Sequence, residues 1–146
     1  MISDRLENCC SLRPLLLAAP LILVAACVPN NIARARCKTH MLSTRDAQSC
    51  TVKADVVGQA SSIEFDTESR NQIAEVAIAL QVKKGSLRVG YNDLEGAHWV
   101  VVTPSEPFTV SMKTRMHPTD RSFNLRFEPV NGNVEGLSGT VDFSML

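Results

Sequence analysis

The chain has 146 residues, of which 45% are hydrophobic, and its 15 lysines and arginines balance its 15 aspartates and glutamates. This length is enough for one domain with a buried core. Because the formal net charge is zero, the chain as a whole has no electrostatic attraction for nucleic acid or for an anionic surface. We therefore expect no nucleic-acid partner.

A short apolar stretch, residues 15–27, lies near the N-terminus and contains Pro20. A membrane-spanning helix needs roughly 20 apolar residues, so this stretch is too short to cross a membrane as a helix. Its length suits the hydrophobic region of a secretory signal. The stretch closes with small residues and one cysteine, Val24-Ala25-Ala26-Cys27.

These last four residues resemble the lipobox of bacterial lipoprotein signal peptides. The resemblance implies that residues 1–26 are removed and that Cys27 becomes the lipidated first residue of the mature protein. An ordinary signal cut after Ala26, or an uncleaved anchor, is the alternative. Val28 follows the cysteine, where the inner-membrane retention signal of enteric bacteria has aspartate. The resemblance therefore implies a cell-envelope lipoprotein anchored to a membrane, with the periplasmic side of the outer membrane favoured.

The cysteine count fits an exported protein. The resemblance implies that Cys9 and Cys10 are lost with the signal and that Cys27 is acylated, which leaves Cys37 and Cys50 as a pair. In an oxidising compartment two leftover cysteines usually join. We therefore expect a Cys37–Cys50 disulfide, with two free, buried thiols as the alternative.

Residues 27–49 are interpreted as the lipidated N-terminus and a tether. Pro29 lacks a backbone donor, and the two asparagines that follow it favour turns. The rest of this segment is mildly basic through Arg34, Arg36, Lys38, His40 and Arg45. We expect a solvated linker, and contact with anionic headgroups is the alternative.

From Cys50 onward the apolar residues recur every second position, which is typical of half-buried strands. Residues 72–84 also suit a helix, but Gly85, before the next apolar series, favours a hairpin with positive φ. Residues 98–103 form a continuous apolar run, so we expect both faces of that strand to be covered. About eight strands in residues 50–146 predict an all-β domain, an antiparallel two-sheet β-sandwich.

The sequence contains no recognisable catalytic motif. A Gly-x-Ser-x-Gly elbow, a His-Glu-x-x-His helix and a phosphate-binding loop are all absent. We therefore expect a protein that is not an enzyme and has no cofactor. Met112, Met116 and His117 could suggest a copper site with soft ligands. The two methionines share the apolar phase of their strand, however, so core packing is preferred and no metal is expected.

Antiparallel strands bring alternate loops to the same end of a sandwich. Residues 68–71, 92–97 and 117–121 would then cluster, and the same count places the tether at this end. Loops on a rigid scaffold often carry binding residues. Trp99 is interpreted as a core residue, with a ligand platform as the alternative. The candidate binding residues are Asp93, Glu95, His98, Trp99, His117 and Asp120.

Two functions remain open from the sequence. The first is a lipid-anchored, non-catalytic binding or structural module that recognises an envelope protein or a glycan. The alternative is a periplasmic ligand- or metal-binding sensor or carrier that uses the loops at one end. An exposed Trp99, or a pocket with convergent polar groups, would favour a small ligand, whereas a flat apolar patch would favour a protein partner.

Overall fold

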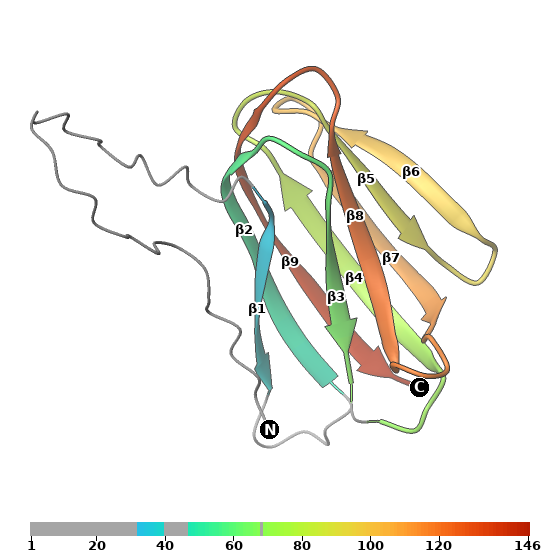
Figure 1. Cartoon of the computed structure of the whole chain (residues 1–146). Helices are drawn as coiled ribbons and strands as arrows, with labels where there is room; N and C mark the ends of the chain where they lie inside the picture. Colours follow the sequence, from blue (N-terminus) through green and yellow to red (C-terminus); the bar gives the residue numbers. More distant parts are fainter. Residues whose placement is uncertain (1–31, 40–46, 68) are drawn as a thin grey trace, which may run out of the picture.

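The computed structural model describes residues 32–39, 47–67 and 69–146. These residues form two antiparallel sheets that pack face to face, so the predicted all-β sandwich is confirmed (Figure 1). Sheet A has five strands in the order β1-β2-β9-β4-β7, and sheet B has four in the order β3-β8-β5-β6. The strands are β1 (Arg34–Thr39), β2 (Ala47–Val57), β3 (Ser61–Asp66), β4 (Ile73–Gln81), β5 (Leu87–Asn92), β6 (Ala97–Val102), β7 (Phe108–Arg115), β8 (Ser122–Pro129) and β9 (Val134–Met145).

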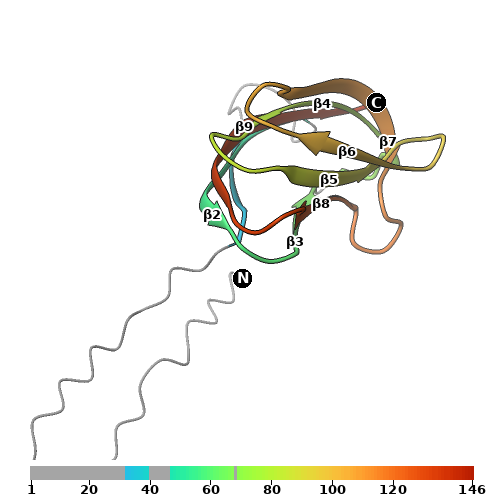
Figure 2. The ribbon, with the colours of Figure 1, turned by 90° about the horizontal axis from the view of Figure 1, so that it is seen from above.

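The core lies between the two sheets, which curve around it as two layers (Figure 2). Alternation along each strand decides which side chains enter the core: in β4, Val76, Ile78 and Leu80 are buried while the residues between them are exposed. Phe65 of β3 stacks on Phe123 of β8, with ring centroids 5.0 Å apart. Full burial of one such side chain contributes about 1.5–3 kcal/mol. Within the described part of the chain, no helix is long and apolar enough to cross a membrane.

The folded domain begins earlier than residue 50, which corrects the interpretation of residues 27–49 as a tether. β1 and the start of β2 both lie inside that range. Ala33 is buried and Ala35 is half-buried, whereas Arg34 and Arg36 are exposed. The alternation is therefore present, but its inward-facing side chains are small. The predicted signal peptide and Cys27 lie outside the described residues.

The expected disulfide is present in the structure. Cys37 and Cys50 lie opposite each other in the register of β1 and β2, and their sulfur atoms are bonded. The bridge attaches the edge strand β1 to a strand that pairs with β9 in the body of sheet A.

The chain enters the sandwich at the end opposite to the one predicted. β1 runs antiparallel to β2, with Arg34 opposite Lys53 and Thr39 opposite Gln48. The start of β1 therefore lies toward the end of the sandwich where β2 finishes, and β2 begins at the other end (Figure 1). The prediction failed because it counted strands from Cys50 and omitted β1.

The segment around Gly85 is partly as predicted. β4 is a strand, and Gly85 has φ +88°, the left-handed region that glycine adopts without strain. The predicted hairpin is wrong, because β4 pairs with β7 and β9 in sheet A whereas β5 pairs with β6 and β8 in sheet B. Both edges of β4 are occupied, so the connection through Gly85 crosses from one sheet to the other.

Candidate functional site

Sheet B opens between β5 and β8, and this opening forms the candidate site. β5 pairs with β6 along its whole length, but it pairs with β8 only as far as Gly90 opposite Arg126. Beyond Gly90 the β5–β6 hairpin approaches β7 of sheet A. There Thr114 Oγ1 donates to Asn92 O at 2.8 Å, and Leu94 N–H donates to Lys113 O at 3.1 Å. The start of β8 pairs with β3 on its other edge, but its edge toward β5 is unpaired there, which leaves a cleft between β5 and β8.

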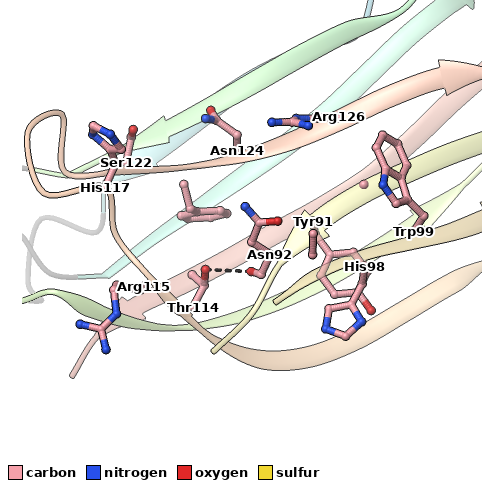
Figure 3. Close-up of a pocket in the computed structure, with 13 residues that line it drawn as sticks. Tyr91, Asn92, His98, Trp99, Thr114, Arg115, His117, Ser122, Asn124 and Arg126 are labelled. Carbon is pink, nitrogen blue, oxygen red and sulfur yellow. Dashed lines mark hydrogen bonds between the residues drawn. The ribbon is translucent and has the colours of Figure 1, made fainter. Parts of the chain in front are cut away.

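The cleft has a volume of about 170 Å³ and is lined by residues from β5, β6, β7 and β8 and from the β7–β8 loop. The buried ring of Phe123 contributes an apolar surface. Polar side chains surround it, and Figure 3 shows Asn124 and Arg126 along β8 with Asn92 across from them. A concave site with aromatic surface and a few polar groups is the usual form of a small-ligand site.

Trp99 lies at one side of the cleft, on the outer face of sheet B, and 39% of it is exposed. Its six-membered ring covers Gly90, where an added Cβ would come within 2.7 Å of the ring atom Cζ3. The Arg88 guanidinium carbon lies 4.3 Å from the ring centroid, a cation–π contact. Arg88 Nη1 is also 3.6 Å from Glu128 Oε2. Gly90 and Arg88 therefore fix the position of the indole.

The core interpretation of Trp99 is wrong, and so is the expectation that both faces of its strand are covered. β6 is an edge strand that pairs only with β5. Val101, two residues beyond Trp99 and on the same face, is 48% exposed. The outer face of β6 is therefore open to solvent despite its apolar sequence.

Several hydrogen-bond donors in the cleft have no partner among the residues that the structure describes. The side chains of Asn92, Asn124 and Arg126 and the indole N–H of Trp99 make no hydrogen bond or ion pair with any other described residue. These donors are therefore available to water or to a ligand. Donors from three strands, β5, β6 and β8, surround one small volume, so the cleft can bind a group rich in oxygen atoms.

Asp93 and His98 form a pair at the β5–β6 loop. Asp93 Oδ1 accepts hydrogen bonds from the backbone N–H groups of Glu95 at 2.7 Å and Gly96 at 3.0 Å, and Oδ2 lies 2.9 Å from His98 Nε2. Desolvation raises the pKa of Asp93. The His98 imidazole and the two N–H groups oppose it and lower the net pKa below the ordinary value of 3.8. Asp93 therefore shapes the loop and holds His98.

His117 and Asp120 form a second pair in the loop between β7 and β8. His117 Nδ1 lies 3.2 Å from Asp120 Oδ2, and both side chains are more than half exposed. The loop closes through the His117 backbone, which donates to Ser122 O at 2.7 Å and accepts from Arg121 N–H at 2.8 Å. Asp120 faces a shallow depression shared with Glu64 and Asp66 rather than the cleft.

The structure brings together part of the predicted set. His98, Trp99 and His117 line the same cleft, with the two histidines at its opposite ends (Figure 3). Asp93 contacts His98 and Asp120 contacts His117, whereas Glu95 is exposed and does not line the cleft. The cleft therefore lies near the predicted end of the sandwich and extends from it onto the face of sheet B.

Asn92, Asn124 and Arg126 line the cleft but were not identified from the sequence. Asn124 and Arg126 occupy the outward phase of β8, where polar residues are ordinary. Gly90 offered the one usable signal, because a glycine inside a strand often marks close approach of another group. Here that group is the Trp99 ring.

The methionines belong to the core, as preferred from the sequence. Met116 is 3% exposed, and Met112 is half-buried against the core cluster. Among the described residues, no three His, Cys, Asp or Glu side chains are grouped closely enough to hold a metal ion.

No protein-family model matches this sequence, and no sequence match to a curated protein was found. Solved structures similar in fold include the PRD1 vertex protein P5, with 10% identity over 71% of this chain and 99% of that chain and a TM-score of 0.47. The CBM22-1 xylan-binding domain of Xyn10C from Paenibacillus barcinonensis has 13% identity, covers 78% of this chain and 84% of that chain, and has a TM-score of 0.39. The family 11 carbohydrate-binding module of Lic26A-Cel5E from Clostridium thermocellum has 9% identity over 78% of this chain and 83% of that chain, with a TM-score of 0.34.

Proposed function

We propose that this protein is a lipid-anchored, non-catalytic binding module of the bacterial cell envelope, and that the cleft in sheet B binds one sugar unit of a glycan. The observation that carries the proposal is the opening between β5 and β8, which places Trp99 and unpartnered donors around one small volume. The alternative of a sensor or carrier for a small ligand would use the same cleft.

The size and chemistry of the cleft support a sugar. Its volume of about 170 Å³ lies below the roughly 300–1,000 Å³ of sites for drug-sized ligands, so it accommodates one ring-sized group. A sugar ring offers many oxygen atoms to the amide groups of Asn92 and Asn124. Its C–H groups can pack on the aromatic surface of Phe123 or Trp99.

The hydrogen-bond partners of the potential catalytic groups support a binding role without covalent chemistry. Ser122 Oγ donates to Glu64 Oε1 rather than to a histidine. The Asp93 carboxylate is occupied by its own loop and by His98. No serine or cysteine in the lining of the described cleft is held by a histidine base, the arrangement that nucleophilic catalysis needs.

Trp99 itself provides the test, because it is the only tryptophan in the chain. A panel of oligosaccharides should include at least one ligand that changes its fluorescence emission saturably. By calorimetry, Trp99→Ala should weaken the binding of that ligand by about 10-fold or more, which corresponds to the loss of about 1.4 kcal/mol of binding free energy. Val101→Ala, on the same face of β6, is the matched control and should bind normally. A panel without any saturable change, or equal loss in both variants, would contradict a glycan site in this cleft.

The anchor is tested separately. Cys27→Ser should move the protein from the detergent-soluble membrane fraction to the soluble fraction, because the thiol that carries lipid in the resembled family is then missing. Continued sedimentation of the Cys27→Ser protein with membranes, together with no effect of detergent on the original protein, would contradict lipidation.

A further inference from the structure

The charged side chains that line the cleft are all basic or imidazole. They are Arg115, Arg126, His98 and His117, and no aspartate or glutamate occurs among the described lining residues. We propose that the ligand of the cleft is an acidic sugar, a sugar ring that carries a carboxylate. This inference rests on the glycan-binding function proposed above, and it specifies that the bound sugar is negatively charged.

Two arginines on the outer face of sheet B differ in their partners. Arg88 is engaged by the Glu128 carboxylate, at 3.6 Å, and by the Trp99 ring. Arg126 lies on the neighbouring strand β8, lines the cleft, and makes no ion pair or hydrogen bond with another described residue. Its guanidinium presents five donors in a planar fork that matches a carboxylate in a bidentate contact.

Two carboxylates beside the cleft already have partners in the protein. Glu64 lies opposite Asn124 in the register of β3 and β8 and accepts a hydrogen bond from Ser122 Oγ. Asp93 holds the β5–β6 loop and contacts His98. Neither reaches Arg126 within ion-pair distance, so the acid that would complement this arginine is supplied by no described residue.

The register of the strands places Arg126 in the same row as the Trp99 ring. Arg126, Gly90 and Trp99 occupy one cross-strand row through β8, β5 and β6. Adjacent strands are about 4.8 Å apart, so Arg126 and Trp99 stand on strands separated by about 10 Å. The Trp99 ring lies over Gly90 between them and fills the space of the missing side chain. A sugar whose carboxylate binds Arg126 would therefore lie beside this ring, within reach of Asn124 and Asn92, which line the same cleft (Figure 3).

The experiment uses the full chain and matched pairs of ligands. The probes are trimers of glucuronate, galacturonate and mannuronate, each with its methyl ester, which removes the charge and keeps the sugar. Titration followed by calorimetry and Trp99 emission should find at least one trimer that binds about 10-fold or more tightly than its ester, because a charge-assisted hydrogen bond is lost. This preference should shrink as salt is raised from 0.05 to 0.5 M, since screening weakens an accessible ion pair.

Arg126→Gln should abolish the preference for the acid over the ester. Arg36→Gln on β1 removes the same charge from an exposed position outside the cleft and should leave the preference intact. An ester or a neutral oligosaccharide that binds as tightly as the acid would overturn the acidic-sugar assignment while leaving a glycan site in place. Tighter binding of a sugar phosphate than of every uronate would overturn the assignment of a carboxylate. Absence of binding by every charged and neutral sugar would overturn this inference and the proposed function together.

Discussion

Gly90 shows how one missing side chain can create a site. The Trp99 ring occupies the space that a Cβ at position 90 would fill, and Arg88 contacts the ring. Gly90 is also the last residue of β5 that pairs with β8. The position of the indole and the point where the sheet opens therefore depend on the same residue.

Replacing Gly90 with alanine should displace Trp99. The new Cβ would lie 2.7–2.9 Å from three carbons of the ring, which is too close, so the partly exposed ring must move outward. The cost to stability should be about 1 kcal/mol, the lower end for overpacking, because a surface side chain can give way. We expect a red-shifted emission maximum, stronger acrylamide quenching and weaker sugar binding in a folded protein. Unchanged emission in Gly90→Ala would mean that the ring does not rest on this glycine.

Asp93 should make stability depend on pH in the acid range. Its folded-state pKa lies below the ordinary value of 3.8, so the carboxylate contributes stability that is fully present above that value. This contribution is lost as the pH falls through the lower, folded-state pKa. Denaturant midpoints measured from pH 6 to pH 2 should therefore fall further for the original protein than for Asp93→Asn, and the two should converge at the acid end. Glu95→Gln, in the same loop, should follow the original protein. Parallel curves for Asp93→Asn and the original protein would contradict this role.

The sequence was enough to predict the strands, but not which strands pair with each other in the sheets. The period-two pattern from residue 50 predicted the eight strands β2–β9. β1 escaped notice because the buried or half-buried residues at its start, Ala33 and Ala35, are only alanines. The opening of sheet B could not be predicted, because it depends on β5 lying beside β8, more than 30 residues away, and parting from it after Gly90. A local pattern carries no information on where such a distant pairing ends.

β1 should depend on its disulfide more than any other described strand. It is an edge strand that pairs only with β2, and Cys37–Cys50 bridges the two with a sequence separation of 13 residues. Changing both cysteines to alanine should lower the free energy of unfolding by about 3 kcal/mol on the chain-entropy estimate. Hydrogen exchange should accelerate first in β1, while β4 and β9 stay protected. Equal protection of β1 with and without the bridge would show that pairing alone holds this strand.

For the whole molecule, the direction of β1 determines which end of the sandwich the anchor can approach. Ile32 precedes β1, so it lies toward the end where β2 finishes. The β5–β6 and β7–β8 loops lie at the other end (Figure 1), and the cleft is lined by residues next to them. From Cys27 to Ile32 the chain can span at most about 18 Å. β9, with 12 residues, runs for about 40 Å. The lipid proposed on Cys27 would therefore hold the end remote from the cleft near the membrane.

The single tryptophan allows this orientation to be measured. In liposomes that contain headgroup nitroxide lipids, emission from Trp99 should be quenched little, because the cleft points away from the bilayer. A second variant, Trp99→Phe with Gln59→Trp, moves the fluorophore to the exposed connection between β2 and β3 at the opposite end and should be quenched strongly. Adding Cys27→Ser to either variant should abolish quenching, since the protein then leaves the membrane. Stronger quenching of Trp99 than of the tryptophan at position 59 would show that the cleft faces the lipid, and a glycan ligand would then have to lie at the membrane surface.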